Sequence, residues 1–180
     1  MISMSIVFWL FIIIFALNGA MRGWAKEMLV SFSVIVGMAF IAVLENLIPM
    51  VSATLRSDPT LDYYVRLLIL AAVAFFGYQS PRFARINQAV EKRDRISDLF
   101  LGFLLGALSG YMVIGTLWSY SNTAGYPFIQ SYVIPPSPQV PGGDSALWLL
   151  ERMPPEWLGA SPNIYIAVVV AFVCVIVLFI

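Results

Sequence analysis

The sequence predicts an all-α membrane protein: a bundle of about five transmembrane helices, with the N-terminus outside and the C-terminus cytoplasmic. Three observations support this prediction. Hydrophobic residues make up 61% of the chain and charged residues only 11%, whereas soluble domains carry about 25% charged residues. Five apolar segments reach or approach the roughly 20 residues that a membrane-spanning helix needs. Lysine and arginine also gather in two of the loops, a bias that sets orientation in the membrane.

The chain divides into a four-span core, an outer loop and a fifth span. The core covers residues 1–120, with spans at about 2–20, 28–53, 61–79 and 98–120. The proline-rich loop covers 121–162 and the fifth span 163–180. The first segment lacks the positively charged start of a signal peptide, so we expect it to be retained as a span. The loops after spans one and three hold seven basic residues and the other side two, which places these two loops in the cytoplasm.

The two cytoplasmic connections differ in length and charge. MRGWAKE, residues 21–27, predicts a tight elbow: Gly23 permits the turn, and Glu27 opens the next helix, where a negative charge suits the helix dipole. Arg22 can reach lipid headgroups, and its simplest role is to set orientation. The charge-dense segment 81–98 has one narrow apolar stripe, which fits either a helix on the membrane surface or a solvated loop.

The outer loop combines proline with tryptophan. Eight of the eleven prolines lie in residues 121–162, and this density favours an extended, semi-rigid path. Within it, DSALWLLERMPP predicts a short amphipathic helix with Asp144 as its N-cap and prolines at its end. Trp148 and Trp157 favour the membrane interface or the surface of a partner.

Two ionisable residues enter the apolar spans. Glu45 lies 18 residues after Glu27, so it is about 27 Å further along the second helix. Arg66 lies one turn into the third span from the same outer side, so we expect a Glu45–Arg66 ion pair, with Asp62 as a competing partner. Since both lie near the interface, we favour a structural pairing over a transport or proton-relay role.

The segment FLGFLLGALSG has glycine at every fourth position. A phosphate-binding loop is excluded because the glycines match no nucleotide fingerprint and lie inside an uninterrupted apolar span. Gly102, Gly106 and Ser109 instead share one helix face, flanked by Gly110, which predicts close helix packing in lipid. Ser33 and Gly37 in span two offer a counterpart, so we expect span four to pack against span two or three, and leave open a contact with another protein.

Two motifs give the chain a resemblance to a known family. The elbow NGAMRGWAKE and the later helix SDLFLGFLLGALSG resemble, in this order, those of the colicin V production protein (CvpA) family of bacterial inner-membrane proteins. The resemblance covers residues 1–120. It implies a non-enzymatic protein linked to toxin production or export and to envelope homeostasis, with Arg22, Gly23 and Glu27 as the elbow and Gly102, Gly106 and Gly110 on the packing helix. The proline-rich loop and fifth span depart from the family.

The sequence favours a scaffold or accessory subunit that acts by helix packing. Its expected partners are membrane lipids and other membrane protein subunits, and nucleic acid is not expected because the net charge is zero. A subunit of a respiratory or photosynthetic complex is one alternative, and a small transporter or channel is another. The absence of histidine argues against an enzyme and against the usual pigment ligand. No cofactor is therefore expected, although bound lipid or carotenoid stays open.

Overall fold

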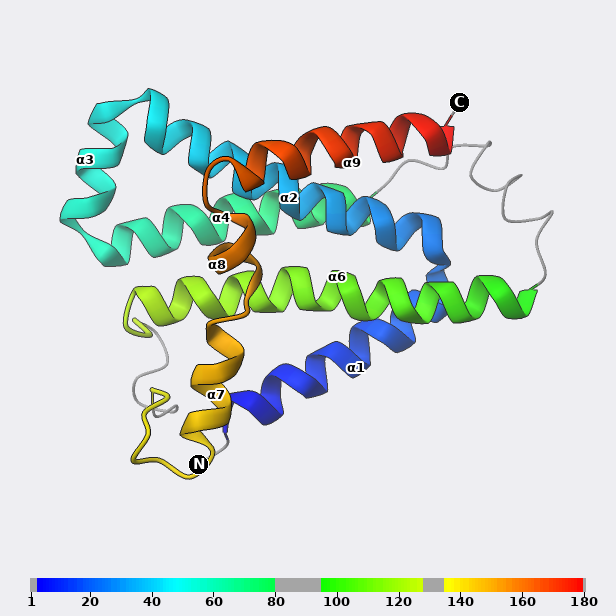
Figure 1. Cartoon of the computed structure of the whole chain (residues 1–180), viewed down its shortest axis with the longest axis horizontal. Coiled ribbons are helices and arrows are strands. Elements are labelled where there is room, and N and C mark those ends of the chain that lie inside the picture. Colours follow the sequence, from blue (N-terminus) through cyan, green and yellow to red (C-terminus); the bar gives the residue numbers. More distant parts are fainter. Residues whose placement is uncertain (1–2, 80–94, 128–134, 180) are drawn as a thin grey trace.

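The chain is a bundle of helices, and the computed structural model describes residues 3–79, 95–127 and 135–179. Within these ranges there is no strand, so the all-α prediction is confirmed. Figure 1 shows the long helices lying side by side, with α7 running across them. The long helices are α1 (Met4–Arg22), α2 (Trp24–Leu47), α4 (Pro59–Tyr78), α6 (Arg95–Thr123) and α9 (Asn163–Phe179). The short helices are α3 (Pro49–Ser57), α7 (Gly143–Leu150) and α8 (Pro154–Leu158).

The long helices have the length and composition of membrane spans. In the described part of the chain, α1, α2, α4 and α6 are each long and apolar enough to cross a membrane. A fifth crossing is obtained if α9 is counted together with the segment Gly143–Leu158, to which it is joined at a 72° bend. The chain is therefore a multi-pass helical membrane protein, with four or five spans.

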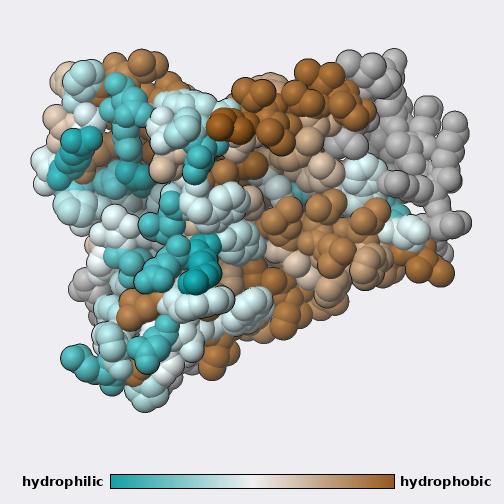
Figure 2. All heavy atoms as spheres, viewed as in Figure 1, coloured by the Kyte–Doolittle hydropathy of each residue, from teal (hydrophilic) through white to brown (hydrophobic). Residues whose placement is uncertain are grey.

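The two ends of the bundle differ in character. The turn between α1 and α2 lies at one end together with the start of α6, and we call this the elbow end (Figure 1). Helix α3 lies at the other end, which we call the cap end, and α7 and α8 lie toward it. In Figure 2 the hydrophilic surface gathers toward the cap end, whereas hydrophobic side chains cover the other half of this face.

The second span is shorter than the sequence predicts. Helix α2 ends at Leu47, and residues 49–57 form the separate helix α3 instead of continuing α2 to residue 53. The cause is Pro49, which lacks an N–H group and whose ring clashes with the preceding turn, so it can begin a helix but not continue one. Asp58 then caps α4, since its Oδ1 accepts from the backbone N–H groups of Thr60 and Leu61 at 2.9 and 3.1 Å.

Other predicted boundaries also shift. Helix α7 begins at Gly143 with Gly142 as its N-cap residue, so Asp144 lies in the first turn and is not the cap. Pro154 and Pro155 begin α8, where a sequence reading has them only end a helix. The surface helix considered for residues 81–98 lies outside the described residues, except for 95–98, which begin α6.

The largest apolar core joins helices from both halves of the chain. Val34 and Met38 of α2 pack with Met112 of α6, and with Leu158 of α8 and Ile164 of α9. Val34 and Ile164 are fully buried. The bend between α8 and α9 is thus part of the core, which holds the segment after residue 142 firmly on the bundle.

Candidate functional site

The glycine face of α6 packs directly on α1. A Cβ atom added to Gly102 would lie 2.5 Å from the carbonyl oxygen of Gly19, and one added to Gly106 would lie 2.5 Å from that of Phe15. Cβ atoms do not approach backbone so closely, so the two helices can touch only because these residues are glycine. In lipid, such close backbone approach supplies the packing energy that the hydrophobic effect supplies in water.

Helix α6 packs on α2 and α4 as expected, but the partner of its glycine face is corrected. The glycines face α1, where Gly19 is the counterpart, and not Ser33 or Gly37 of α2. Ser33 and Gly37 instead receive α4: a Cβ on Gly37 would lie 2.6 Å from Val73, and one on Gly77 would meet the Ser33 hydroxyl. The sequence of α1 does carry a signal for this contact. Ala16 and Ala20 are small residues four positions apart, and they lie beside Gly19.

The predicted elbow residues form a buried polar cluster with α6. Glu27 is fully buried. Its Oε1 accepts from Arg22 Nη1 at 2.6 Å, and its Oε2 accepts from the Ser109 hydroxyl at 2.6 Å. Arg22 also donates to the backbone carbonyl of Tyr78 at 3.1 Å and lies 4.3 Å from the centre of its ring. We call Arg22, Glu27, Tyr78 and Ser109 the Glu27 cluster.

The Glu27 cluster joins four helices at the elbow end. Gly23 makes this possible because its φ of +89° turns the chain between α1 and α2 with no intervening loop. Ser109, which the sequence suggested for helix packing, proves to bind the carboxylate that opens α2. Both oxygens of Glu27 are therefore occupied by protein groups, and the cluster fastens α1, α2, α4 and α6 together.

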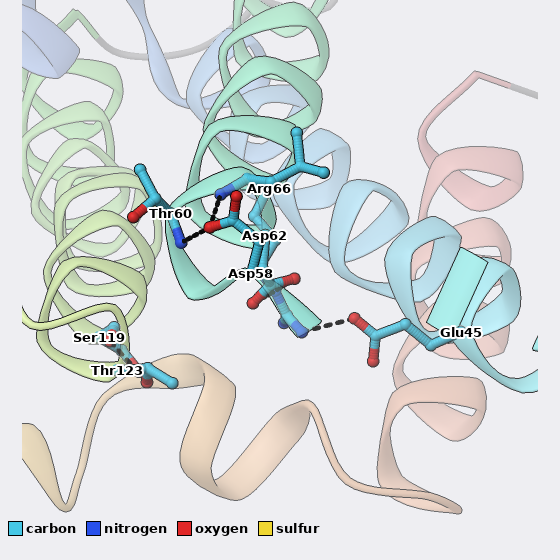
Figure 3. A network of polar contacts seen from close by, with 8 residues as sticks. Glu45, Asp58, Thr60, Asp62, Arg66, Ser119 and Thr123 are labelled. Carbon is cyan, nitrogen blue, oxygen red and sulfur yellow. Dashed lines mark hydrogen bonds and ion pairs between the residues drawn. The ribbon is translucent and has the colours of Figure 1, made fainter. Parts of the chain in front are cut away.

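A second polar cluster lies toward the cap end (Figure 3). The structure brings Glu45 of α2 and Arg66 of α4 together, with 2.5 Å between Glu45 Oε1 and Arg66 Nη2. Arg66 Nε also donates to both carboxylate oxygens of Asp62, at 2.8 and 2.9 Å, so Asp62 complements the Glu45 pair and does not displace it. The guanidinium lies 5.2 Å from the ring centre of Tyr120. We call Glu45, Asp62, Arg66 and Tyr120 the Arg66 cluster.

A small cavity adjoins the Arg66 cluster. It has a volume of about 70 Å³ and lies between α2, α3 and α4. Besides the three charged residues of the cluster, Ser52, Leu55 and Arg56 line it. This volume suffices for a few water molecules. Among the described residues, no group of three or more histidine, cysteine or acidic side chains is placed to hold a metal ion.

The Glu45–Arg66 pair should show measurable coupling. In a double-mutant cycle with Glu45→Gln and Arg66→Gln, we expect a coupling free energy of about 1 kcal/mol, because each side chain is only about one-quarter exposed. Reversible unfolding in mixed micelles would measure it. Neutral variants are needed because a charge swap would place glutamate beside Asp62. Independent effects of the two substitutions would show that the pair contributes nothing to stability.

The two tryptophans of the cap end lie on the surface of α7 and α8. Trp148 is 55% exposed and Trp157 is 47% exposed. Arg152 lies 4.0 Å from the ring centre of Trp148, and Trp157 Nε1 donates to the Tyr111 hydroxyl at 3.1 Å. The Tyr111 hydroxyl in turn donates to the backbone carbonyl of Arg152. We call α7 and α8 together the cap layer.

Side chains that are small or buried hold the cap layer on α6. A Cβ added to Gly115 would lie 2.8 Å from Met153 Sδ and 2.9 Å from Pro154 Cδ, so this glycine makes room for the turn between α7 and α8. Met153 is fully buried. Nearby, Trp118 donates to the Tyr126 hydroxyl at 3.0 Å, and burial raises the pKa of Tyr126 above its ordinary value. The exposed tryptophans therefore lie on a layer that packs tightly on α6.

Fold and site together define a multi-pass helical membrane protein in which two polar clusters fasten the spans. Comparison with known protein families, with characterised proteins and with solved structures gave no match.

Proposed function

We propose that the protein is a non-enzymatic scaffold or accessory subunit of a larger membrane assembly. The observation that carries this proposal is the cap layer, which is anchored on the buried Met153 yet exposes Trp148 and Trp157. Large aromatic side chains on a rigid base are typical of the contacts that dominate protein interfaces. Tryptophan also favours the membrane–water interface. This preference is compatible with the scaffold proposal, because a partner in the same membrane would contact the cap layer at the depth of that interface.

The polar groups inside the bundle support a structural role. In the described part of the spans, Glu27 is bound by Arg22 and Ser109, and Arg66 is bound by Glu45 and Asp62. Charges that are paired in this way stabilise a fixed arrangement of helices. Helix packing, and not catalysis, is therefore the activity that these residues favour.

Site-specific photocrosslinking in native membranes tests the scaffold proposal. We expect a crosslinking amino acid at position 148 or 157 to give a discrete protein adduct. The control is the same amino acid at Ile13, which is 55% exposed on α1, away from the cap layer. Adducts equal at all three positions, or a detergent-solubilised protein that is monomeric and crosslinks to nothing, would contradict the proposal.

The scaffold proposal has two versions, which differ in the expected partner. The resemblance of residues 1–120 to colicin V production proteins favours the bacterial inner membrane and a role in toxin export or envelope homeostasis. The cap layer and α9 favour instead an accessory subunit of a respiratory or photosynthetic complex. Affinity purification with mass spectrometry separates the two, because it identifies the proteins that remain bound.

A small transporter or channel is a second candidate, favoured by the charged cavity beside Arg66. Its lining of Glu45, Asp62, Arg56 and Arg66 could bind a small ion. Ion flux in proteoliposomes tests this function directly. Flux that is lost in Glu45→Gln would favour transport. Absence of flux in both wild type and variant would rule out transport and leave the scaffold as the one remaining proposal.

A further inference from the structure

An apolar groove lies on α6 between α1 and α4. Helix α6 runs between these two helices in Figure 1, and the groove has a volume of about 310 Å³. Val7, Phe8 and Phe11 of α1 form one wall, and Ile114 and Trp118 of α6 form its floor. None of the described residues that line it is charged. A charged or strongly polar ligand would lose its hydration here without compensation, so the occupant must be apolar along most of its length.

The groove has one polar end. The hydroxyl groups of Tyr63 and Ser121 lie 3.4 Å apart and both line the groove. Ser121 is two residues before the end of α6 at Thr123, so this polar end lies at the cap end of the bundle. The opposite part, toward Phe11, lies deeper along α1, about 10 Å from the start of that helix at Met4. The lining thus suits a molecule with a hydrogen-bonding group near the membrane surface and a hydrocarbon chain directed inward.

The groove is continuous with the surface that faces the lipid. Phe11 is 40% exposed, and its neighbours on α1, Leu10 and Ile14, are 55% and 48% exposed. Because the chain is a multi-pass membrane protein, these side chains contact lipid hydrocarbon. A hydrocarbon chain can therefore enter the groove sideways from the bilayer without crossing water.

We propose that this groove binds one acyl chain of a bilayer phospholipid. The ester end lies at the hydroxyls of Tyr63 and Ser121, and the chain runs along Phe8 and Trp118 toward Phe11. Helices α1 and α4 both pack on α6, and the chain fills the space that they leave between them. The bound lipid makes dispersion contacts with α1, α4 and α6 at once and so becomes part of the bundle.

The fluorescence of Trp118 tests the proposal, because this side chain is 3% exposed and lines the groove. The full chain, with the other four tryptophans replaced by phenylalanine, is placed in phosphatidylcholine vesicles whose acyl chains carry bromine. Trp118 lies five residues from the end of α6, which is about 7.5 Å. We therefore expect bromine near the ester end to quench its emission more strongly than bromine near the methyl end.

Two matched variants separate bound lipid from general lipid contact. Ile114→Phe fills the groove and should restore the emission, whereas Ile13→Phe adds the same volume to an exposed position of α1 and should leave the quenching unchanged. If the protein with one tryptophan does not fold, the phospholipid retained by the detergent-purified wild type provides the readout. Ile114→Phe should then retain one phospholipid fewer per chain than Ile13→Phe. Absence of quenching, or equal quenching and equal retention in both variants, would overturn the proposal.

Discussion

Replacing Gly106 by leucine is expected to separate α1 from α6 and to remove most of the folded protein. A Cβ at this position would meet the carbonyl oxygen of Phe15 at 2.5 Å and the Cα of Gly19 at 2.9 Å. Neither is the end of a flexible side chain, so the helices themselves must move apart. Overpacking of a well-packed core costs about 1–3 kcal/mol and sometimes more. Size-exclusion chromatography of the detergent-extracted protein measures the loss.

Two further variants test this prediction: one shows whether the change in stability comes from the close contact, and the other serves as a control. Alanine in place of a helical glycine is favourable by about 1 kcal/mol in water when nothing is close, so destabilisation by Gly106→Ala shows that the contact exists. Ala72→Leu adds a larger side chain at an exposed position of α4 and should leave the protein folded. A stabilised Gly106→Ala, or equal losses in Gly106→Leu and Ala72→Leu, would contradict the close packing.

Removing the arginine of the Glu27 cluster should destabilise the protein by a comparable amount. Among the described residues, Arg22→Ala leaves the fully buried Glu27 carboxylate with the Ser109 hydroxyl as its one bonded partner. Breaking a buried ion pair on one side costs about 3–5 kcal/mol, and we expect the lower end because the Arg22 side chain is 20% exposed. The free energy of unfolding in mixed micelles measures the effect.

A control variant separates the loss of the ion pair from an effect on the orientation of the protein in the membrane. Lys26→Ala removes the same charge from the same elbow, but Lys26 makes no ion pair among the described residues, so we expect a small effect on stability. The double variant Arg22→Met/Glu27→Met removes both charges and should recover most of the lost stability. Ser109 then keeps its 3.0 Å bond to the Gly106 carbonyl. Equal losses for Lys26→Ala and Arg22→Ala would point to orientation instead.

The helices could be predicted from the sequence because hydropathy alone decides which segments can span a membrane. The four spans of the core and the final helix follow from runs of apolar residues, and the break at Gly23 from backbone chemistry, whereas the break at Pro49 is missed because the predicted second span extends to residue 53. The approach of Glu45 to Arg66 could also be inferred, because equal depth on consecutive helices limits the partners that a buried charge can find.

The partners of the helices could not be predicted in the same way. A stripe of small residues shows that a helix can be approached closely, but not which helix approaches it. Gly106 therefore suggested α2 or α4, although its neighbour is α1. Likewise, Glu27 suited the start of α2 through the helix dipole alone, while its bond to Ser109 depends on a contact between residues 82 positions apart. Such long-range contacts leave no local pattern.

The contact between Gly19 and Gly102 has a consequence for how the protein is made. More than 80 residues separate the two glycines, so at about 5–20 residues per second α6 is synthesised roughly 4–16 s after α1. During this interval α1 and α2 are already in the membrane, with Glu27 lacking the hydroxyl of Ser109. Until α6 is made, the nascent chain thus lacks the main packing partner of α1, and Glu27 has Arg22 as a partner but lacks Ser109.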